Sequence, residues 1–416
     1  MNRTVKQGAA AMDMYVAAGF EPVREAFEQG VTDLSDGGGA FCAYVDGAPV
    51  VDLWGGTARP GEPWASDTRA VLMSLTKGLA ALCVQILVDR GQVDVDAPVS
   101  AYWPEFAAGG KEKVLVRHVL THTAGVLSFP GEQELLGLDG TGWDDYDAIA
   151  KGLAAAAPFW EPGTRFGYHA LTFGWLLGEI VRRVTGRRVG VFFHEEVAEP
   201  LGLDTRIGTP SAEQRLVAHV RPFSFAGLPP QAVQAYEANQ ARIRDAGTLA
   251  GQAHAARNGT TLLDHPDEFF NNRHVLGLEI PSANGTSTAR GLARLFAMLA
   301  MGGELDGVRL LSPQTVRAFG TVQVRSPDAT SEDDPGGQSL IVPWGLGYIG
   351  NFAAPGRGLR YGPVESAFGS EGGGGQIAFC DPEHRISVGF VRSQFDMIGT
   401  FSAGLIDALY RCVGDS

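Results

Sequence analysis

The order of strand and helix patterns along the chain is the feature that most limits its fold. Near the N-terminus, Ala40–Leu53 alternates apolar and polar residues around an Asp46-Gly47 turn and predicts a β-hairpin. Three more strand patterns and a closing helix come only near the C-terminus: Gly345–Ile349, Gln376–Phe379, Ile386–Val391 and Ala403–Arg411. Helical patterns fill the stretch between. The chain therefore predicts an α/β (α+β) fold, an antiparallel sheet built from both termini and flanked by helices, with a mostly helical insert.

This order also predicts the domain organisation of the 416-residue chain. Residues 1–75 and 286–416 are expected to form the sheet domain, and residues 76–285 the helical one. Besides a helix that begins near Ser74 and ends at Gly91, three helices are predicted between the two groups of strands: Val116–Leu120, Phe173–Val184 ending at Gly186, and Thr288–Met301. Residues 209–285 mix Pro, Gly and Asn with short helical patterns and are expected to form an insertion over a site.

Composition excludes several classes of protein. The apolar content of 44% and the charged content of 19% are those of an ordinary globular chain. A net charge of −14 disfavours nucleic acid and anionic membranes as partners. No run of 18 apolar residues occurs, so no membrane span is expected. The sequence leaves the oligomeric state open.

The cysteines and the N-terminal residues indicate the cellular compartment in which the protein is expected. Cys42, Cys83, Cys380 and Cys412 are widely spaced and form no C-x-x-C pair, which argues against a zinc ribbon or a redox motif. The first residues contain no apolar core of a signal peptide. A cytoplasmic protein with reduced thiols is expected.

A serine and a lysine one helical turn apart form the first candidate for chemistry. Ser74-Leu75-Thr76-Lys77 is an S-x-x-K sequence at the start of an amphipathic stretch that predicts a helix with one apolar face. Residues three apart lie on one helix surface, so the Lys77 amine can reach the Ser74 hydroxyl and act as its base. The alternative is a serine that caps a helix beside an exposed lysine.

Tyr168 and a glycine-rich segment are the next candidates. Tyr168 follows the turn at Pro162-Gly163 and precedes a helix; a tyrosine beside a lysine can have a lowered pKa and relay protons, or it can simply pack at the helix start. Gly369–Gly375 leads into a strand, and its amides can serve an oxyanion. The alternative for these glycines is a flexible loop.

Metal and nucleotide sites find little support. His118 and His122 have the spacing of a metal pair, but no third ligand accompanies them, so structural hydrogen bonds are expected and no metal. The sequence contains no G-x-S-x-G elbow and no Walker-type loop. No cofactor is predicted.

The order and spacing of four motifs resemble the serine β-lactamase/penicillin-binding superfamily, in its class C-like branch. After Ser74–Lys77 come Leu120–Gly125 (L-T-H-T-A-G), Pro162–Tyr168 (P-G-T-R-F-G-Y) and the glycine-rich strand entry. Ile280–Gly285 and Thr288–Arg290 are similar to family VIII carboxylesterases and related acyltransferases in particular. The resemblance covers most of residues 35–205 and 285–395.

The resemblance implies a role for individual residues. Ser74 would be the nucleophile, Lys77 its base or hydrogen-bond partner, and Tyr168 the family's motif tyrosine. The third motif falls on Ser370-Glu371-Gly372, and the oxyanion hole on the amides of Ser74 and Gly373. The candidate substrate contacts are Ser370, Gly372, His169, Ala170 and Trp344.

Two departures from the family pattern narrow the substrate. Ala170 and Ser370 stand where β-lactamases have Asn and Lys, and Glu371 adds a negative charge, so a neutral ester or amide is favoured over a β-lactam. Three functions are compatible with these residues: a serine carboxylesterase or amidase acting on a small acyl substrate, a transacylase on the same scaffold, and an inactive binding protein. The last is disfavoured because Ser74, Lys77 and Tyr168 are all present.

Overall fold

An antiparallel sheet forms the centre of one half of the molecule. The computed structural model describes residues 14–33, 37–225, 230–332, 341–353, 358–395 and 399–414. In the described chain the sheet has the order β1-β3-β2-β12-β11-β10-β9, with β4 paired to β3. Its strands are β1 (Tyr15–Val16), β2 (Gly38–Val45), β3 (Ala48–Arg59), β4 (Glu62–Pro63), β9 (Ile349–Gly350), β10 (Phe368–Glu371), β11 (Ile377–Asp381) and β12 (Ile386–Arg392).

The two ends of the chain meet in the middle of this sheet. β12 pairs with β2 in a register that runs from Ile386 opposite Val45 to Arg392 opposite Gly39. The predicted hairpin is present as β2 and β3, and both residues of its turn have positive φ, 52° at Asp46 and 77° at Gly47. The predicted antiparallel sheet from both termini is therefore confirmed.

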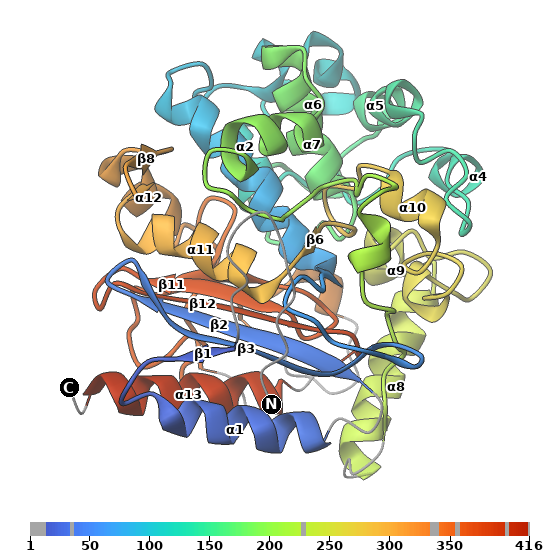
Figure 1. The fold of residues 1–416 in the computed structure, drawn as a ribbon. Coiled ribbons are helices and arrows are strands. Elements are labelled where there is room, and N and C mark those ends of the chain that lie inside the picture. Colours follow the sequence, from blue (N-terminus) through green and yellow to red (C-terminus); the bar gives the residue numbers. More distant parts are fainter. Residues whose placement is uncertain are drawn as a thin grey trace.

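Alternation along the strands supplies a core on each face of the sheet. On β2, Phe41 and Ala43 point toward the helices α1 (Glu21–Asp33) and α13 (Thr400–Gly414), while Cys42 belongs to the core on the opposite face. Figure 1 shows α1 and α13 side by side beneath the sheet and α11 (Ala289–Ala300) above it. The sheet is thus a middle layer between helices, which is why both of its faces are apolar.

Most of the helical residues lie beyond α11, on the side of the sheet away from the termini (Figure 1). The predicted helices are present as α3, α6 and α11, and α6 ends at Gly186, whose φ is +73°. The helices of the region are α2 (Thr76–Asp89), α3 (Val116–Leu120), α4 (Glu132–Leu135), α5 (Tyr146–Ala155), α6 (Thr172–Thr185), α7 (Val189–Phe193), α9 (Leu249–Ala253), α10 (Arg273–Gly277) and α12 (Pro313–Gly320). Helix α8 (Pro230–Arg244) instead extends down past the level of the sheet (Figure 1). The predicted domain limits at 75/76 and 285/286 remain a prediction.

The prediction of a one-sided apolar helix after Ser74 is wrong. Every residue of α2 from Thr76 to Leu87 is buried, because α6, α7, α12 and β10 all contact it. A helix enclosed on all sides is apolar around its whole circumference. Lys77 is therefore inside the protein from the first turn of the helix.

The strand predicted at Gly345–Ile349 also needs correction, because β9 begins only at Ile349. Gly347 has a φ of +101°, and a Cβ on it would lie 2.4 Å from the Ala81 side chain on α2. The close approach to α2 and the left-handed backbone interrupt the extended pattern there.

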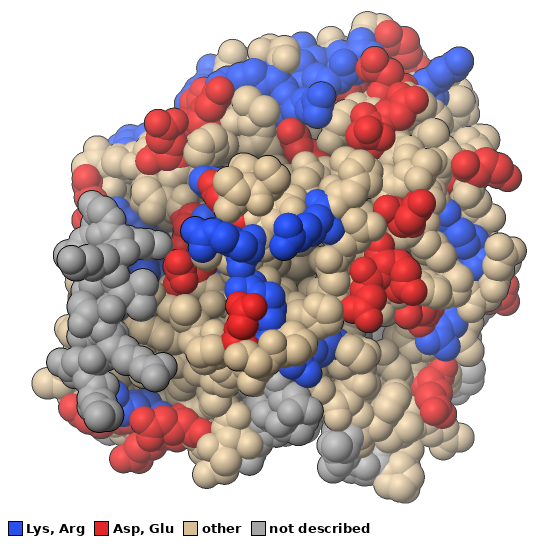
Figure 2. Space-filling view, turned by 45° about the vertical axis from the view of Figure 1, so that its right-hand side comes forward, with Lys and Arg blue, Asp and Glu red and all other residues tan. Residues whose placement is uncertain are grey.

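The charge on the surface and the length of the helices can be compared with the predictions about nucleic acid and membranes as partners. On the face drawn in Figure 2, basic side chains gather near the centre and along the upper edge, with acidic side chains beside both groups. Among the described residues, no helix combines the length and apolar character that a bilayer crossing requires. Residues 1–13, on which the expectation of no signal peptide depends, lie outside the described residues.

Candidate active site

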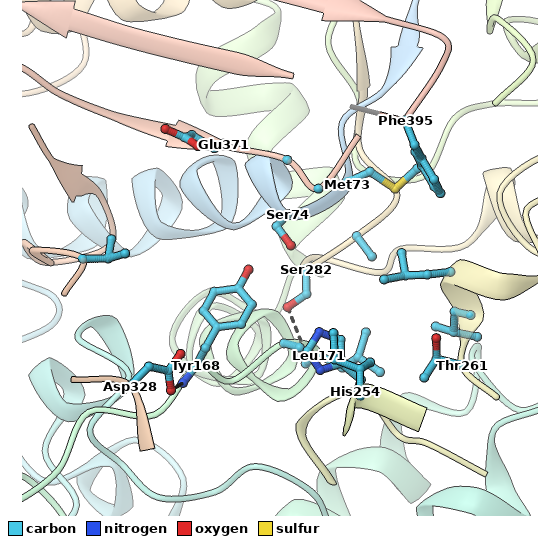
Figure 3. A pocket seen from close by; sticks show the side chains of 18 of the residues that line it. Met73, Ser74, Tyr168, Leu171, His254, Thr261, Ser282, Asp328, Glu371 and Phe395 are labelled. Atoms are coloured by element: carbon cyan, nitrogen blue, oxygen red, sulfur yellow. Dashed lines mark hydrogen bonds between the residues drawn. The ribbon is translucent and has the colours of Figure 1, made fainter. Parts of the chain in front are cut away.

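Ser74 is presented by a tight turn directly before α2. It lies in the 3₁₀ turn Met73–Leu75, and Met73 has a φ of +50°, a conformation that non-glycine residues rarely adopt. The turn is held by the Thr76 hydroxyl, which donates to the Met73 carbonyl at 2.6 Å, and by the Leu72 amide, which donates to the Gly285 carbonyl at 2.7 Å. This clamped backbone directs the Ser74 hydroxyl into a cavity (Figure 3).

Lys77 sits one turn further on and is almost completely buried. Its Nζ lies 3.2 Å from Ser74 Oγ, 2.7 Å from the Ala170 carbonyl oxygen and 3.1 Å from the Ser282 carbonyl oxygen. Burial holds the pKa of Lys77 well below its ordinary value, which favours the neutral amine. In the neutral form, the two N–H groups of the amine can both donate to the two carbonyls. The lone pair of that form is then directed to the Ser74 hydroxyl proton.

Tyr168 completes the group around the serine. The Lys77 Nζ lies 4.9 Å from the centroid of its ring. Burial raises the pKa of Tyr168, and a hydrogen bond with Ser74 offsets only part of this rise. The expected lowering of the Tyr168 pKa beside a lysine is therefore wrong, because burial of the Tyr168 side chain is the largest effect on its pKa. The tyrosine is a protonated hydroxyl that can pass a proton on.

The loop that carries Tyr168 is held by His122 of the L-T-H-T sequence. His122 Nδ1 accepts a hydrogen bond from the His169 amide at 3.0 Å, and its ring stacks on Phe173 with centroids 4.5 Å apart. His118 Nδ1 accepts from the Leu115 amide at 3.2 Å. The structural role expected for this pair is what the contacts show. Within the described ranges no three His, Cys, Asp or Glu residues come together as metal ligands would.

The expected substrate contact at His169 needs correction. Its Nε2 accepts from the Val126 amide at 3.0 Å, and its Nδ1 lies 2.6 Å from the Gly167 carbonyl, to which it donates. Burial lowers the pKa of His169 to about 4, so the ring is neutral. Both nitrogens hold the loop, whereas its neighbour Ala170 does line the cavity, as does Trp344.

The glycine-rich segment reaches the cavity through Glu371, Gly372 and Gly373, but not through Ser370. Ser370 is buried against Gly78 of α2, and its hydroxyl donates to the Leu75 carbonyl at 3.4 Å. The placement of Ser370 therefore does not support the predicted substrate contact. Glu371 forms an ion pair with Arg360, so its charge is compensated, contrary to the expectation from the sequence.

The cavity itself has a volume of about 450 Å³ and mostly apolar walls. Residues 209–285 contribute part of the lining, which includes Tyr236, Gln240, Ile243, His254, Thr261, Leu262, Leu263, Phe270, Ser282 and Ala283. Among its polar groups, Asp328 and Arg360 were not predicted. Neither lies in a recognisable motif, so only the fold brings them to the serine.

Ser282 shows how a segment from the second half of the chain positions the amine of Lys77. Its hydroxyl donates to the Leu171 carbonyl at 2.8 Å (Figure 3) and accepts from the Gly174 amide at 2.8 Å. A Cβ on Gly174 would lie 2.4 Å from the backbone of Pro281, so only glycine allows this approach. The Ser282 carbonyl is thereby fixed where it accepts from Lys77.

Tyr168→Phe tests the proton relay directly. We expect the variant to lose about 10²- to 10³-fold in kcat for ester cleavage, because it deletes only the hydroxyl that is expected to pass the proton. The ring and its packing remain, so the unfolding temperature should stay within a few degrees of the wild type. Steady-state kinetics and thermal unfolding of the two proteins check this. A variant that keeps its kcat would remove Tyr168 from the reaction.

Comparisons with known proteins agree with this architecture. The sequence matches the Beta-lactamase family over residues 23–404. The esterase/beta-lactamase LipL of Mycobacterium tuberculosis is 36% identical over 381 residues, which covers 89% of this chain and 80% of LipL.

Two solved structures are similar over almost the whole chain. A family VIII carboxylesterase has 33% identity and a TM-score of 0.79, with 96% of this chain and 100% of that chain covered. A penicillin-binding protein homologue from Caulobacter crescentus has 35% identity, the same TM-score and the same coverage. Fold and relatives together define a serine hydrolase of the kind that transfers acyl groups. The chain belongs to the Beta-lactamase family.

Proposed function

We propose that the protein is a serine carboxylesterase that acts through an acyl-enzyme on Ser74. The observation that carries the proposal is the environment of Lys77: a buried amine whose two N–H groups face carbonyls and whose third direction faces Ser74 Oγ at 3.2 Å. Such an amine can remove the serine proton without a histidine. The esterase names of LipL and of the family VIII relative support the same activity.

The reaction proceeds in two steps on these residues. Ser74 Oγ attacks the ester carbonyl carbon while its proton passes to Lys77, and the amides of Ser74 and Gly373 stabilise the oxyanion. The carbon–oxygen bond to the alcohol then breaks, and the proton reaches the leaving oxygen through the Tyr168 hydroxyl. Water attacks the acyl-enzyme with the same base and releases the acid.

The substrate class follows from the walls of the cavity. Mostly apolar lining favours a neutral acyl group. Ala170 offers no side-chain amide to a substrate, and Ser370 offers no ammonium to a substrate carboxylate. A small-molecule ester is therefore favoured over a β-lactam, and an amide is the second choice. An alcohol or amine acceptor could replace water in so apolar a cavity, which makes acyl transfer the alternative activity.

A direct comparison of two chromogenic substrates tests this choice. We expect p-nitrophenyl butyrate to be cleaved with a kcat/KM at least about 100-fold above that for nitrocefin, because each of the two missing polar partners is worth about a factor of ten. Adding an alcohol or a primary amine to the ester assay separates hydrolysis from transfer by the products formed. Comparable turnover of nitrocefin and the ester would overturn the assignment.

The state of the cysteines supports a proposal for the cellular compartment of the protein. Cys42, Cys83 and Cys380 are buried free cysteines, as is usual in reducing compartments. We infer a cytoplasmic enzyme, which a fractionation of the producing cells would check.

A further inference from the structure

The cavity has two ends, and the proton transfer proposed for Tyr168 determines which end binds the alcohol part of the substrate. In Figure 3, Tyr168, Asp328 and Glu371 lie on one side of Ser74, and Thr261 and Phe395 lie on the other. The leaving oxygen must come within reach of the Tyr168 hydroxyl, which delivers its proton. If Ser74 and Tyr168 act as proposed above, the alcohol part lies on the Tyr168 side and the acyl chain extends toward Phe395.

A carboxylate stands on the alcohol side of the cavity. Asp328 Oδ1 accepts hydrogen bonds from the Tyr168 amide at 3.1 Å, the Thr330 amide at 2.8 Å and the Thr330 hydroxyl at 2.9 Å. All three bonds go to one oxygen, so the carboxylate is fixed in place while Oδ2 takes no part in them. Asp328 lines the cavity, so its carboxyl group is available to whatever occupies this end. Burial raises the pKa of Asp328, and the hydrogen bonds from Thr330 and Tyr168 offset part of that rise. The mechanism does not use this group.

Aromatic rings surround the same end. Phe166, Tyr168 and Trp344 all line the cavity. The Trp344 ring lies 6.0 Å from Phe166 and 6.2 Å from Tyr168, measured between centroids. The faces of such rings carry negative charge and attract cations, and a carboxylate among them adds to that attraction.

The basic groups nearby have hydrogen-bond partners other than this carboxylate, although Arg242 is close enough to attract it. Arg360 lines the cavity but is paired with Glu371. Arg242 donates to the Thr330 carbonyl and to Asn239. Lys77 donates to the Ala170 and Ser282 carbonyls, and burial lowers its pKa. The alcohol end of the cavity therefore combines mostly apolar walls with a carboxyl group to which none of these three basic side chains donates a hydrogen bond.

We propose that the compartment formed by Phe166, Tyr168, Trp344 and Asp328 binds an ammonium group, so that the preferred substrates are esters of amino alcohols, with choline esters as the simplest members. In the reaction the ester carbon–oxygen bond breaks, the amino alcohol leaves with the proton from Tyr168, and the acyl group stays on Ser74 until water releases it. The neutral acyl preference and the cationic alcohol preference are then properties of opposite ends of one cavity.

A pair of isosteric esters tests the proposal on the whole enzyme. Butyrylcholine and 3,3-dimethylbutyl butyrate have the same shape, but carbon replaces the charged nitrogen in the second. We expect the wild type to cleave butyrylcholine with a kcat/KM about tenfold or more above that of the neutral ester, the factor that one cation–π contact or ion pair supplies. Asp328→Asn keeps the acceptor for the three hydrogen bonds and should lower this ratio about tenfold.

Two further variants serve as controls for the proposed ammonium site. Trp344→Leu removes a ring but no charge and should also lower the ratio, which separates a cation site from a general loss of structure. Asp144→Asn removes an exposed carboxylate outside the cavity and should leave the ratio unchanged. Equal kcat/KM values for the two esters in the wild type would overturn the ammonium site while leaving the esterase intact. Failure to cleave either ester would count against the esterase proposal as well.

Discussion

Ser74→Ala should abolish ester cleavage, lowering kcat by about 10⁴-fold or more, the loss usual for a missing nucleophile. The Ser74 hydroxyl is the group that lies 3.2 Å from the Lys77 amine, and without it no acyl-enzyme can form. The change deletes one oxygen from a partly exposed side chain in a turn whose hydrogen bonds are made by Leu72 and Thr76. The fold should persist, which circular dichroism and thermal unfolding would check.

A fluorophosphonate identifies the nucleophile independently of turnover. Mass spectrometry of the treated wild type should place the adduct on Ser74, and the Ala variant should take up none. Ser331→Ala is the matched control, because Ser331 lines the same cavity but makes no contact with Lys77. An adduct on another serine, or activity left in the Ser74 variant, would show that the reaction takes another course.

The parts of the site that the sequence predicts are those encoded within one short segment. Ser74 and Lys77 are one helical turn apart, so their proximity follows from helix geometry alone. The sheet was predictable for a similar reason, because strand periodicity and the Asp46-Gly47 turn are local. Tyr168 came from its motif, not from any spacing that relates it to Ser74.

What the sequence did not reveal depends on contacts between distant segments. The carbonyls that hold Lys77 belong to residues 93 and 205 positions further along the chain. The burial of α2 on all sides comes from α6, α7, α12 and β10, which follow it in the sequence. The raised pKa of Tyr168 comes from the burial of its own side chain, which also depends on the fold. The pairing of Glu371 with Arg360 likewise joins a strand to a loop. A charge counted in the sequence says nothing about its partner.

Lys77→Arg should be nearly as inactive as Ser74→Ala, with a loss in kcat of about 10³-fold or more. A guanidinium stays protonated at every working pH, so it cannot take the serine proton, although it keeps a positive charge. Lys77→Met is the second variant, because an unbranched apolar chain of similar size fits the buried position better than the larger Arg. Single-turnover acylation by a p-nitrophenyl ester measures the step that both variants should lose.

The pH dependence separates a base from a merely structural lysine. Burial depresses the pKa of Lys77 from its ordinary value of 10.5, so the neutral amine forms as the pH rises through the lowered pKa. Wild-type acylation should therefore increase with pH across that pKa. Between the lowered pKa and 10.5 the unfolded chain binds one more proton than the folded chain at this residue, so the free energy of unfolding should also rise with pH there. Lys77→Met should show neither slope. If Lys77→Arg kept most of the activity, Lys77 would not be the base, whatever the family of the fold.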